Sequence, residues 1–112
     1  MDFEPSALIV DAIARKRRLR FTYSGKARLA EPQCYGIGHR GTELLRVHLL
    51  EGVGQQVEPL FEVTKMRDLR ALDEFFVRPG PHYKENDSAM KKIFAQLSCN
   101  RWTCRRKRIR AR

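Results

Sequence analysis

The sequence predicts a small α+β domain that is mainly β, with an N-terminal helix, a five-stranded β-barrel and a C-terminal helix. Apolar residues recur at helical spacing near both ends of the chain. Between these ends, short segments alternate apolar and polar residues and are separated by glycine-containing turns. A chain of 112 residues has the length of one domain with a single core.

The first helix is predicted to begin near Pro5, because the missing N–H of proline costs nothing in a first helical turn. Its apolar stripe is formed by Leu8, Ile9, Ala12, Ile13 and Lys16. The basic run 15–18 closes the helix. We favour a solvated helix end that complements the helix dipole. The alternative is a phosphate-contacting patch continuous with Arg20 and Arg28.

A β-hairpin is predicted next, over residues 19–32, where Leu19 and Phe21 alternate with polar residues. A two-residue loop at Ser24-Gly25 places Phe21 opposite Arg28. A three-residue loop that also includes Tyr23 places Phe21 opposite Ala27 and leaves Arg20 and Arg28 on the solvent face. We favour the three-residue loop and expect Pro32 to end regular pairing.

Further strands complete the predicted barrel. A bent strand should run from Pro32 to a turn at Arg40-Gly41, and the strand 44–50 should turn Leu45, Val47 and Leu49 to one face. The other face of that strand is apolar enough to need partial cover. Residues 51–56 form a loop.

The closing part of the barrel is expected to follow Pro59, with Phe61 and Val63 pointing inward. A connector at 64–68, with one helical turn, then leads to a short strand at 69–72. At least one ring of Phe75 and Phe76 must pack in the interior.

A second helix is predicted after the boundary at Pro79, Gly80 and Pro81. Asn86 or Asp87 would cap it, and its apolar stripe consists of Met90, Ile93, Phe94 and Leu97. The expected organisation is therefore a barrel with its N-terminal helix over 1–78, a linker and helix over 79–97, and a tail over 98–112.

The charge of the chain is concentrated in this tail. Of the net charge of +10, the last 15 residues carry +7 and contain no acid, whereas residues 1–97 hold 16 basic and 13 acidic side chains. We expect the tail to be disordered alone. Such a polycation attracts phosphate, and Trp102 adds a ring that could stack on a base. Anionic lipid, ribosomal RNA or an acidic protein are alternative partners.

The order of motifs over residues 7–73 resembles the start of a WYL domain. The resemblance rests on a helix ending in basic residues (Ile13–Arg18), then Tyr23, Gly25, Arg28, Glu31 and Pro32, and on the later strand LFEVTKM at 60–66. It implies an Sm-like or SH3-like small barrel in a bacterial regulator, with nucleic acid or a nucleotide-type ligand bound through basic residues. The family's Trp and Tyr are absent near residues 43–45, and Pro59 and Lys65 stand where the family has arginines. The chain is expected to be a divergent, stand-alone member.

No catalytic constellation is present in the sequence, so we expect a non-enzymatic protein. The three histidines lack metal-binding spacing, and Cys99 and Cys104 alone cannot complete a structural zinc site, so neither a metal nor a cofactor is expected. Three cysteines without a framework spacing indicate a reducing compartment, and we expect the cytoplasm. No apolar run of 18 residues could cross a membrane.

We therefore predict that the chain binds single-stranded DNA or RNA, or a nucleotide-type ligand, in bacterial transcription regulation or a stress response. The predicted contact residues are Arg17, Arg18, Arg20, Arg28, Arg46, Lys65, Trp102, Arg105, Arg106 and Arg108. The alternative is a protein-interaction or homodimerisation module that uses Leu44, Leu50 and the predicted helix 90–97, with only incidental affinity for nucleic acid.

Overall fold

The computed structural model describes residues 4–51 and 58–98, and within them it contains one α-helix, one short 3-10 helix and six strands. In chain order these are α1 (Ala7–Arg15), β1 (Arg17–Tyr23), β2 (Lys26–Gly38), β3 (Glu43–Glu51), β4 (Leu60–Glu62), η1 (Val63–Lys65), β5 (Arg67–Phe75) and β6 (Met90–Gln96). The mainly β prediction is confirmed. No helix in the described part is long and apolar enough to cross a membrane.

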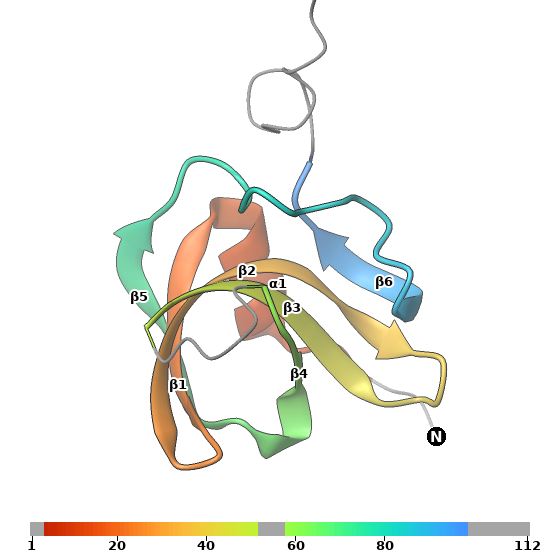
Figure 1. Cartoon of the computed structure of the whole chain (residues 1–112), viewed down its shortest axis with the longest axis horizontal. Helices are drawn as coiled ribbons and strands as arrows, with labels where there is room; N and C mark the ends of the chain where they lie inside the picture. Colours follow the sequence, from red (N-terminus) through yellow and green to blue (C-terminus); the bar gives the residue numbers. More distant parts are fainter. Residues whose placement is uncertain (1–3, 52–57, 99–112) are drawn as a thin grey trace, which may run out of the picture.

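All six strands belong to one antiparallel sheet, which is built around β2 (Figure 1). Five strands follow the order β4-β3-β2-β1-β5, and β6 pairs with β2 off this path. Along one edge β2 pairs with β3. Along its other edge, β2 pairs first with β1 and then with β6. The 13-residue strand β2 therefore positions three neighbours.

Pro32 lies inside β2 at the point where its partner changes. The ladder with β1 ends at Ala30, and the ladder with β6 begins at Cys34. Because proline cannot donate a ladder hydrogen bond, a position between two ladders interrupts neither of them. The expectation that Pro32 ends regular pairing holds for the ladder with β1 only, because Pro32 itself pairs with Val47 of β3 and the strand continues to Gly38.

The sheet curls so strongly that β1 and β4 face each other. These strands are three positions apart in the sheet, which corresponds to about 14 Å in a flat sheet. The ring centroids of Phe21 and Phe61 are nevertheless 5.3 Å apart, and Tyr23 lies 4.5 Å from Phe61. The backbone N–H of Glu62 also donates to the Tyr23 hydroxyl at 3.2 Å. Within the described residues, β4 and β5 share no ladder and are connected through η1.

Helix α1 closes one side of the core through Ile9, Ala12 and Ile13, which are buried against the inner face of the sheet. The helix begins one residue after its cap, Ser6, whose hydroxyl accepts from the N–H of Ile9. Pro5 therefore precedes the helix, and the prediction that it forms part of the first turn is wrong.

Two other details of the predicted helix need correction. Leu8 was placed on the apolar stripe, but it is an exposed side chain because the buried face is narrower than the stripe. The basic run does not form the helix end as a unit. The helix stops at Arg15, Lys16 adopts a left-handed conformation as the C-cap, and Arg17 and Arg18 already belong to β1.

The β1–β2 hairpin has the two-residue loop, so the favoured three-residue loop is wrong. Phe21 pairs with Arg28, and Leu19 pairs with Ala30. Both loop residues have positive φ, 53° at Ser24 and 76° at Gly25. This type of turn matches the right-handed twist of paired strands, which the alternation of side chains alone does not reveal. The one-residue change moves Arg28 from the solvent face to the face that carries Phe21.

The predicted C-terminal helix is also wrong, because Met90–Gln96 forms strand β6. Two bulges explain the misleading pattern. Between its paired positions β6 contains one extra residue at Lys91 and another at Phe94. Each extra residue shifts the alternation of faces by one, so the apolar spacing of the strand imitates that of a helix.

The inward residues of the middle strands are as expected. Leu45, Val47, Leu49 and Phe61 are buried. Val63 is only partly buried, because it begins the 3-10 helix η1 rather than continuing the strand. Phe76 is buried while Phe75 is 54% exposed, which satisfies the expectation for this pair.

The predicted strand 69–72 is longer in the structure, where β5 spans Arg67–Phe75. Most of the predicted loop 51–56 lies outside the described residues. The outer face of β3 was expected to be covered by a helix or a second chain, and it is partly covered by the irregular segment 79–88 (Figure 1).

Gly36 provides a test of the β2–β6 packing. A Cβ atom there would lie 2.1 Å from the carbonyl oxygen of Lys92, which is backbone and cannot rotate away. We expect Gly36→Ala to lower the free energy of unfolding by about 1–3 kcal/mol, measured by urea unfolding followed by far-UV circular dichroism. The control is Gly25→Asn, where space is open and asparagine tolerates positive φ. Equal effects of the two substitutions would contradict the proposed close approach.

Candidate functional site

The predicted barrel arginines on the outer face of β1 are engaged in ion pairs. Arg18 Nε lies 3.0 Å from Glu31, and its Nη1 lies 3.5 Å from Glu74. Arg20 Nη2 lies 3.3 Å from Glu51. Since each guanidinium already faces a carboxylate, its attraction for an external phosphate is reduced.

Arg17 has a structural partner of another kind. Its Nε donates to the carbonyl oxygen of Leu72 at 3.0 Å, and its guanidinium lies 5.9 Å from the ring centroid of Phe75. Leu72 lies where the β1–β5 register is interrupted, between the pairs Arg17–Phe75 and Leu19–Ala71. Arg17 therefore satisfies a carbonyl that the irregular ladder leaves without its usual partner.

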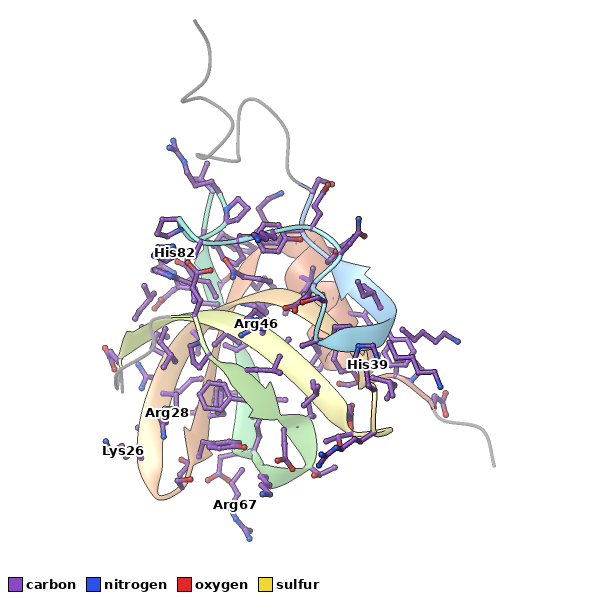
Figure 2. The ribbon with its side chains drawn as sticks, turned by 45° about the vertical axis from the view of Figure 1, so that its right-hand side comes forward. Lys26, Arg28, His39, Arg46, Arg67 and His82 are labelled. Atoms are coloured by element: carbon purple, nitrogen blue, oxygen red, sulfur yellow. The ribbon has the colours of Figure 1, made fainter. Side chains whose placement is uncertain are left out.

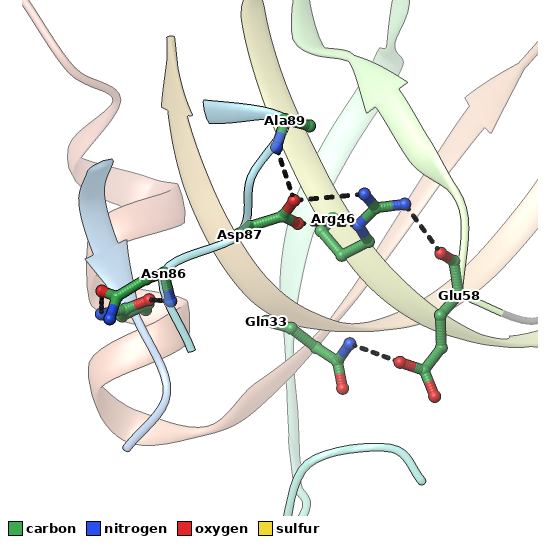
Figure 3. Close-up of polar contacts among 7 residues, drawn as sticks. Gln33, Arg46, Glu58, Asn86, Asp87 and Ala89 are labelled. Carbon is green, nitrogen blue, oxygen red and sulfur yellow. Dashed lines mark hydrogen bonds and ion pairs between the residues drawn. The ribbon is translucent and has the colours of Figure 1, made fainter. Parts of the chain in front are cut away.

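Arg46 and Lys65 are also paired, with different degrees of burial. Arg46 forms a two-pronged contact with Asp87, at 2.8 Å from Nε and 3.3 Å from Nη2, and donates to the carbonyl of Glu58 at 3.2 Å (Figure 3). Lys65 lies 3.5 Å from Glu62, three residues earlier, and both side chains are largely exposed. The remaining predicted contacts, Trp102, Arg105, Arg106 and Arg108, lie outside the described residues.

Arg28 differs from the other predicted residues because it lies over aromatic rings. Its guanidinium carbon is 5.4 Å from the ring centroid of Phe61 and 5.9 Å from that of Tyr23. Its Nη2 donates to the Tyr23 carbonyl at 3.0 Å. These contacts follow from the two-residue turn, which turns Arg28 to the side of Phe21.

Three further cations surround this end of the β1–β2 hairpin: Lys26, Arg67 and Arg70. All three are exposed, and within residues 4–51 and 58–98 they make no ion pair or side-chain hydrogen bond. Lys26 begins β2 opposite Tyr23, while Arg67 and Arg70 pair with Thr22 and Arg20 on β1. Figure 2 shows Lys26, Arg28 and Arg67 around the hairpin turn. We call Lys26, Arg28, Arg67 and Arg70 the hairpin-end cluster.

Of these four residues, only Arg28 was predicted from the sequence. No sequence motif marks Lys26, Arg67 or Arg70. They can be recognised as unpaired only when the fold shows which acids lie beside each cation. The antiparallel pairing of β1 with β5 could have suggested the proximity of Arg67, but the register of that pairing contains two irregularities.

A second feature is a polar cavity of about 370 Å³ between the outer face of the sheet and the segment 82–88. Its walls include Gln33 from β2, Arg46 from β3 and Glu58, which precedes β4. It also includes three carboxylates, those of Glu58, Glu85 and Asp87. The cavity is therefore not a predominantly basic pocket of the kind that the family resemblance implied.

The polar groups of this cavity mainly bond to one another. The side chain of Gln33, which is fully buried, donates to Glu58 at 3.1 Å (Figure 3). It also accepts from the N–H of Gly80 at 2.6 Å. Glu58 also accepts from the N–H of His82, and His48 Nδ1 lies 3.7 Å from its carboxylate. This network fastens the segment after β5 to the sheet and satisfies groups whose burial would otherwise be costly.

Asp87 is the charged partner that completes the network. Burial opposes its ionisation, but the hydrogen bonds from Arg46 and from the N–H of Ala89 outweigh this effect and hold the pKa of the carboxyl below its usual value of 3.8. Asp87 therefore stays ionised at neutral pH. It caps a turn before β6 instead of the helix that was expected there.

Among the described residues, Cys34 is a buried free cysteine. Burial is the main cause that raises the pKa of the Cys34 thiol to about 11, and the nearby Asp87 carboxylate adds to it. A thiol of this kind is a poor nucleophile at neutral pH. Among the described residues, no group of three His, Cys, Asp or Glu side chains is arranged to hold a metal ion.

Loss of the Arg46–Asp87 contact should destabilise the fold. We expect Arg46→Met to lower the free energy of unfolding by about 1–3 kcal/mol, because it leaves a largely buried carboxylate without its main partner. The matched control is Lys65→Met, which removes an exposed pair and should cost at most about 0.5 kcal/mol. Urea unfolding at neutral pH distinguishes these outcomes, and similar losses in both variants would contradict the structural role of Arg46.

The same contact should make stability depend on pH. Because folding lowers the pKa of Asp87, the stabilisation is complete above its ordinary value of 3.8 and is lost as the pH falls below that value. We expect the stability deficit of Asp87→Asn to be largest near neutral pH and to shrink in acid. The control is Asp73→Asn, at an exposed position on β5. A deficit that stays constant down to about pH 2 would refute the assignment.

Comparisons of the chain with protein-family models, with curated proteins and with solved structures find no match.

Proposed function

We propose that this protein is a non-enzymatic small β-barrel that binds single-stranded nucleic acid, or a nucleotide-type ligand, at its hairpin-end cluster. The basic tail 98–112 serves as a second, non-specific anchor for phosphate. In this proposal the chain is a divergent WYL-like protein of Sm-like or SH3-like architecture. It works in the cytoplasm in a regulatory setting, such as bacterial transcription or a stress response.

The observation that carries the proposal is the contrast between paired and unpaired cations. Arg18, Arg20 and Arg46 each face a carboxylate, whereas Lys26, Arg67 and Arg70 face solvent around one end of the hairpin. A cation without an internal partner can contact phosphate without breaking an existing ion pair, so the contact costs less free energy. Each such contact releases counterions from the nucleic acid and adds to the affinity.

The curled sheet supports the proposed barrel architecture. The path β4-β3-β2-β1-β5 brings Phe61 of β4 against Phe21 and Tyr23 of β1, so the two sides of the sheet enclose a shared core. Tyr23 is partly exposed at the same end as the basic side chains, whereas Phe61 is buried beneath Arg28. A partly exposed ring beside cations is typical of proteins that bind single strands.

A protein-interaction module remains the second candidate, because some large apolar side chains are exposed. Val77 is 73% exposed, Phe75 is 54% exposed and Leu50 is 38% exposed. The β6 segment proposed for dimerisation carries exposed Lys91 and Lys92 and two bulges, which are features that discourage edge-to-edge pairing. The two candidates differ in their response to salt, since an apolar interface depends little on it.

The test is fluorescence-anisotropy binding of a labelled single-stranded oligonucleotide over a range of salt concentrations. It compares the full chain with a chain that ends at Ser98, which keeps the bonds that the Leu97 backbone makes to Gln33 and Tyr83. In both chains, the double variant Lys26→Ala/Arg67→Ala should bind more weakly. The slope of log affinity against log salt should be shallower by about 1.4, or 0.7 for each lost phosphate contact.

The matched control is Arg40→Ala/Lys91→Ala, which removes the same charge at the opposite end of β2. This control should bind nearly as well as the unmodified chain. Circular dichroism should confirm that the truncated chain and all variants are folded. Equal binding by the two double variants, or binding that vanishes entirely with the tail, would contradict a specific role for the hairpin-end cluster.

A further inference from the structure

Arg28 differs in kind from the other cations of the hairpin-end cluster, and its surroundings suit a different task. We propose that Arg28 is a base-stacking residue, over which one unstacked base of a bound single strand lies, and not a phosphate contact. This inference rests on the proposed function, and it assigns a specific part of the ligand to a specific side chain.

The guanidinium of Arg28 is held in place before any ligand binds. Phe61 and Tyr23 lie beneath it at 5.4 and 5.9 Å, distances within the range of cation–π attraction. The hydrogen bond from Nη2 to the Tyr23 carbonyl restricts its rotation. Tyr23 is itself fixed, since its hydroxyl accepts from the N–H of Glu62. Ligand binding therefore needs little further ordering of this side chain.

The position of Arg28 favours a flat ligand surface over a phosphate group. One edge of the guanidinium is committed to the Tyr23 carbonyl, and its Nε is buried. The side chain as a whole is only partly buried, so a ligand can reach it. Arginine planes are known platforms for unstacked bases, and stacking tolerates all four bases because each has a π-face.

The neighbouring cations would hold the phosphates on either side of such a base. Lys26 lies two residues before Arg28 on β2, and Arg67 lies across β1 from it. The exposed side chains of Lys26 and Arg67 attract phosphate groups, and this attraction does not depend on the base sequence. Because bases inside a duplex are already stacked on one another, this arrangement favours a single strand over a duplex with the same number of phosphates.

The experiment measures how much affinity depends on bases, using the full chain. Two single-stranded oligonucleotides of equal length are compared, one with bases and one with abasic sugars throughout, so that the phosphates are the same. The unmodified chain should prefer the base-bearing strand. Arg28→Lys, which keeps the charge but loses the planar group, should reduce this preference by about 5- to 100-fold. The matched control is Arg67→Lys, which should leave the preference unchanged.

The possible outcomes separate this inference from the proposed function. If both strands bind the unmodified chain equally and with a salt dependence, phosphate binding stands and the stacking role of Arg28 is refuted. A preference that survives Arg28→Lys also refutes it, and assigns the stacking to another residue. If neither strand binds, the proposed function fails together with the inference.

A second measurement avoids any substitution at Arg28. In the unmodified chain, the NMR signal of the Arg28 Nε–H should shift on addition of the base-bearing strand, because a base stacked nearby changes the local magnetic environment. The abasic strand should leave the signal nearly unchanged. Equal shifts with both strands would overturn the inference even if Arg28→Lys did not fold.

Discussion

The three ladders of β2 are the constraint on which the rest of the structure depends. β3 occupies one edge of this 13-residue strand, while β1 and β6 divide the other edge at Pro32. Paired strands twist, and bulges in the ladders of β2 with β3 and β6 increase this twist locally. The resulting curl brings β1 over β4 and creates the interior that α1 covers. The positions of Tyr23 and Phe61, and hence of Arg28 above them, follow from this geometry.

The charge distribution has the same origin. The part of the chain before the tail has nearly balanced charge, and among the described residues five acids form ion pairs with particular arginines: Asp11, Glu31, Glu51, Glu74 and Asp87. Glu31 of β2 and Glu51 of β3 neutralise Arg18 and Arg20. Within residues 4–51 and 58–98, Lys26, Arg67 and Arg70 at the hairpin end form no ion pair, so these three side chains are available to an external phosphate.

The polar network beneath the segment 79–88 has a structural role. Gln33 and Glu58 are nearly inaccessible to solvent, and each accepts a backbone N–H of the segment, from Gly80 and His82 respectively. Arg46 connects the same segment to β3 through Asp87. Gln33, Glu58 and Asp87 each have hydrogen-bond partners, and buried polar groups that find partners favour one arrangement over others. The network therefore determines how the chain returns to β2 to add β6.

Several features follow from the sequence alone. The N-terminal helix, the alternating strands around Phe21 and Val47, and the burial of one ring of the pair Phe75 and Phe76 result from local periodicity and from the cost of exposing large apolar groups. The sign of the charge and its concentration in the tail are also properties of the sequence itself. Tertiary structure decided the features that depend on distant partners. It set the hairpin register, because the turn must match the twist of the paired strands, and it made 90–96 a strand, because β2 offered an open edge. It also determined which arginines are neutralised and which remain free, since an ion pair depends on distances between residues far apart in the chain.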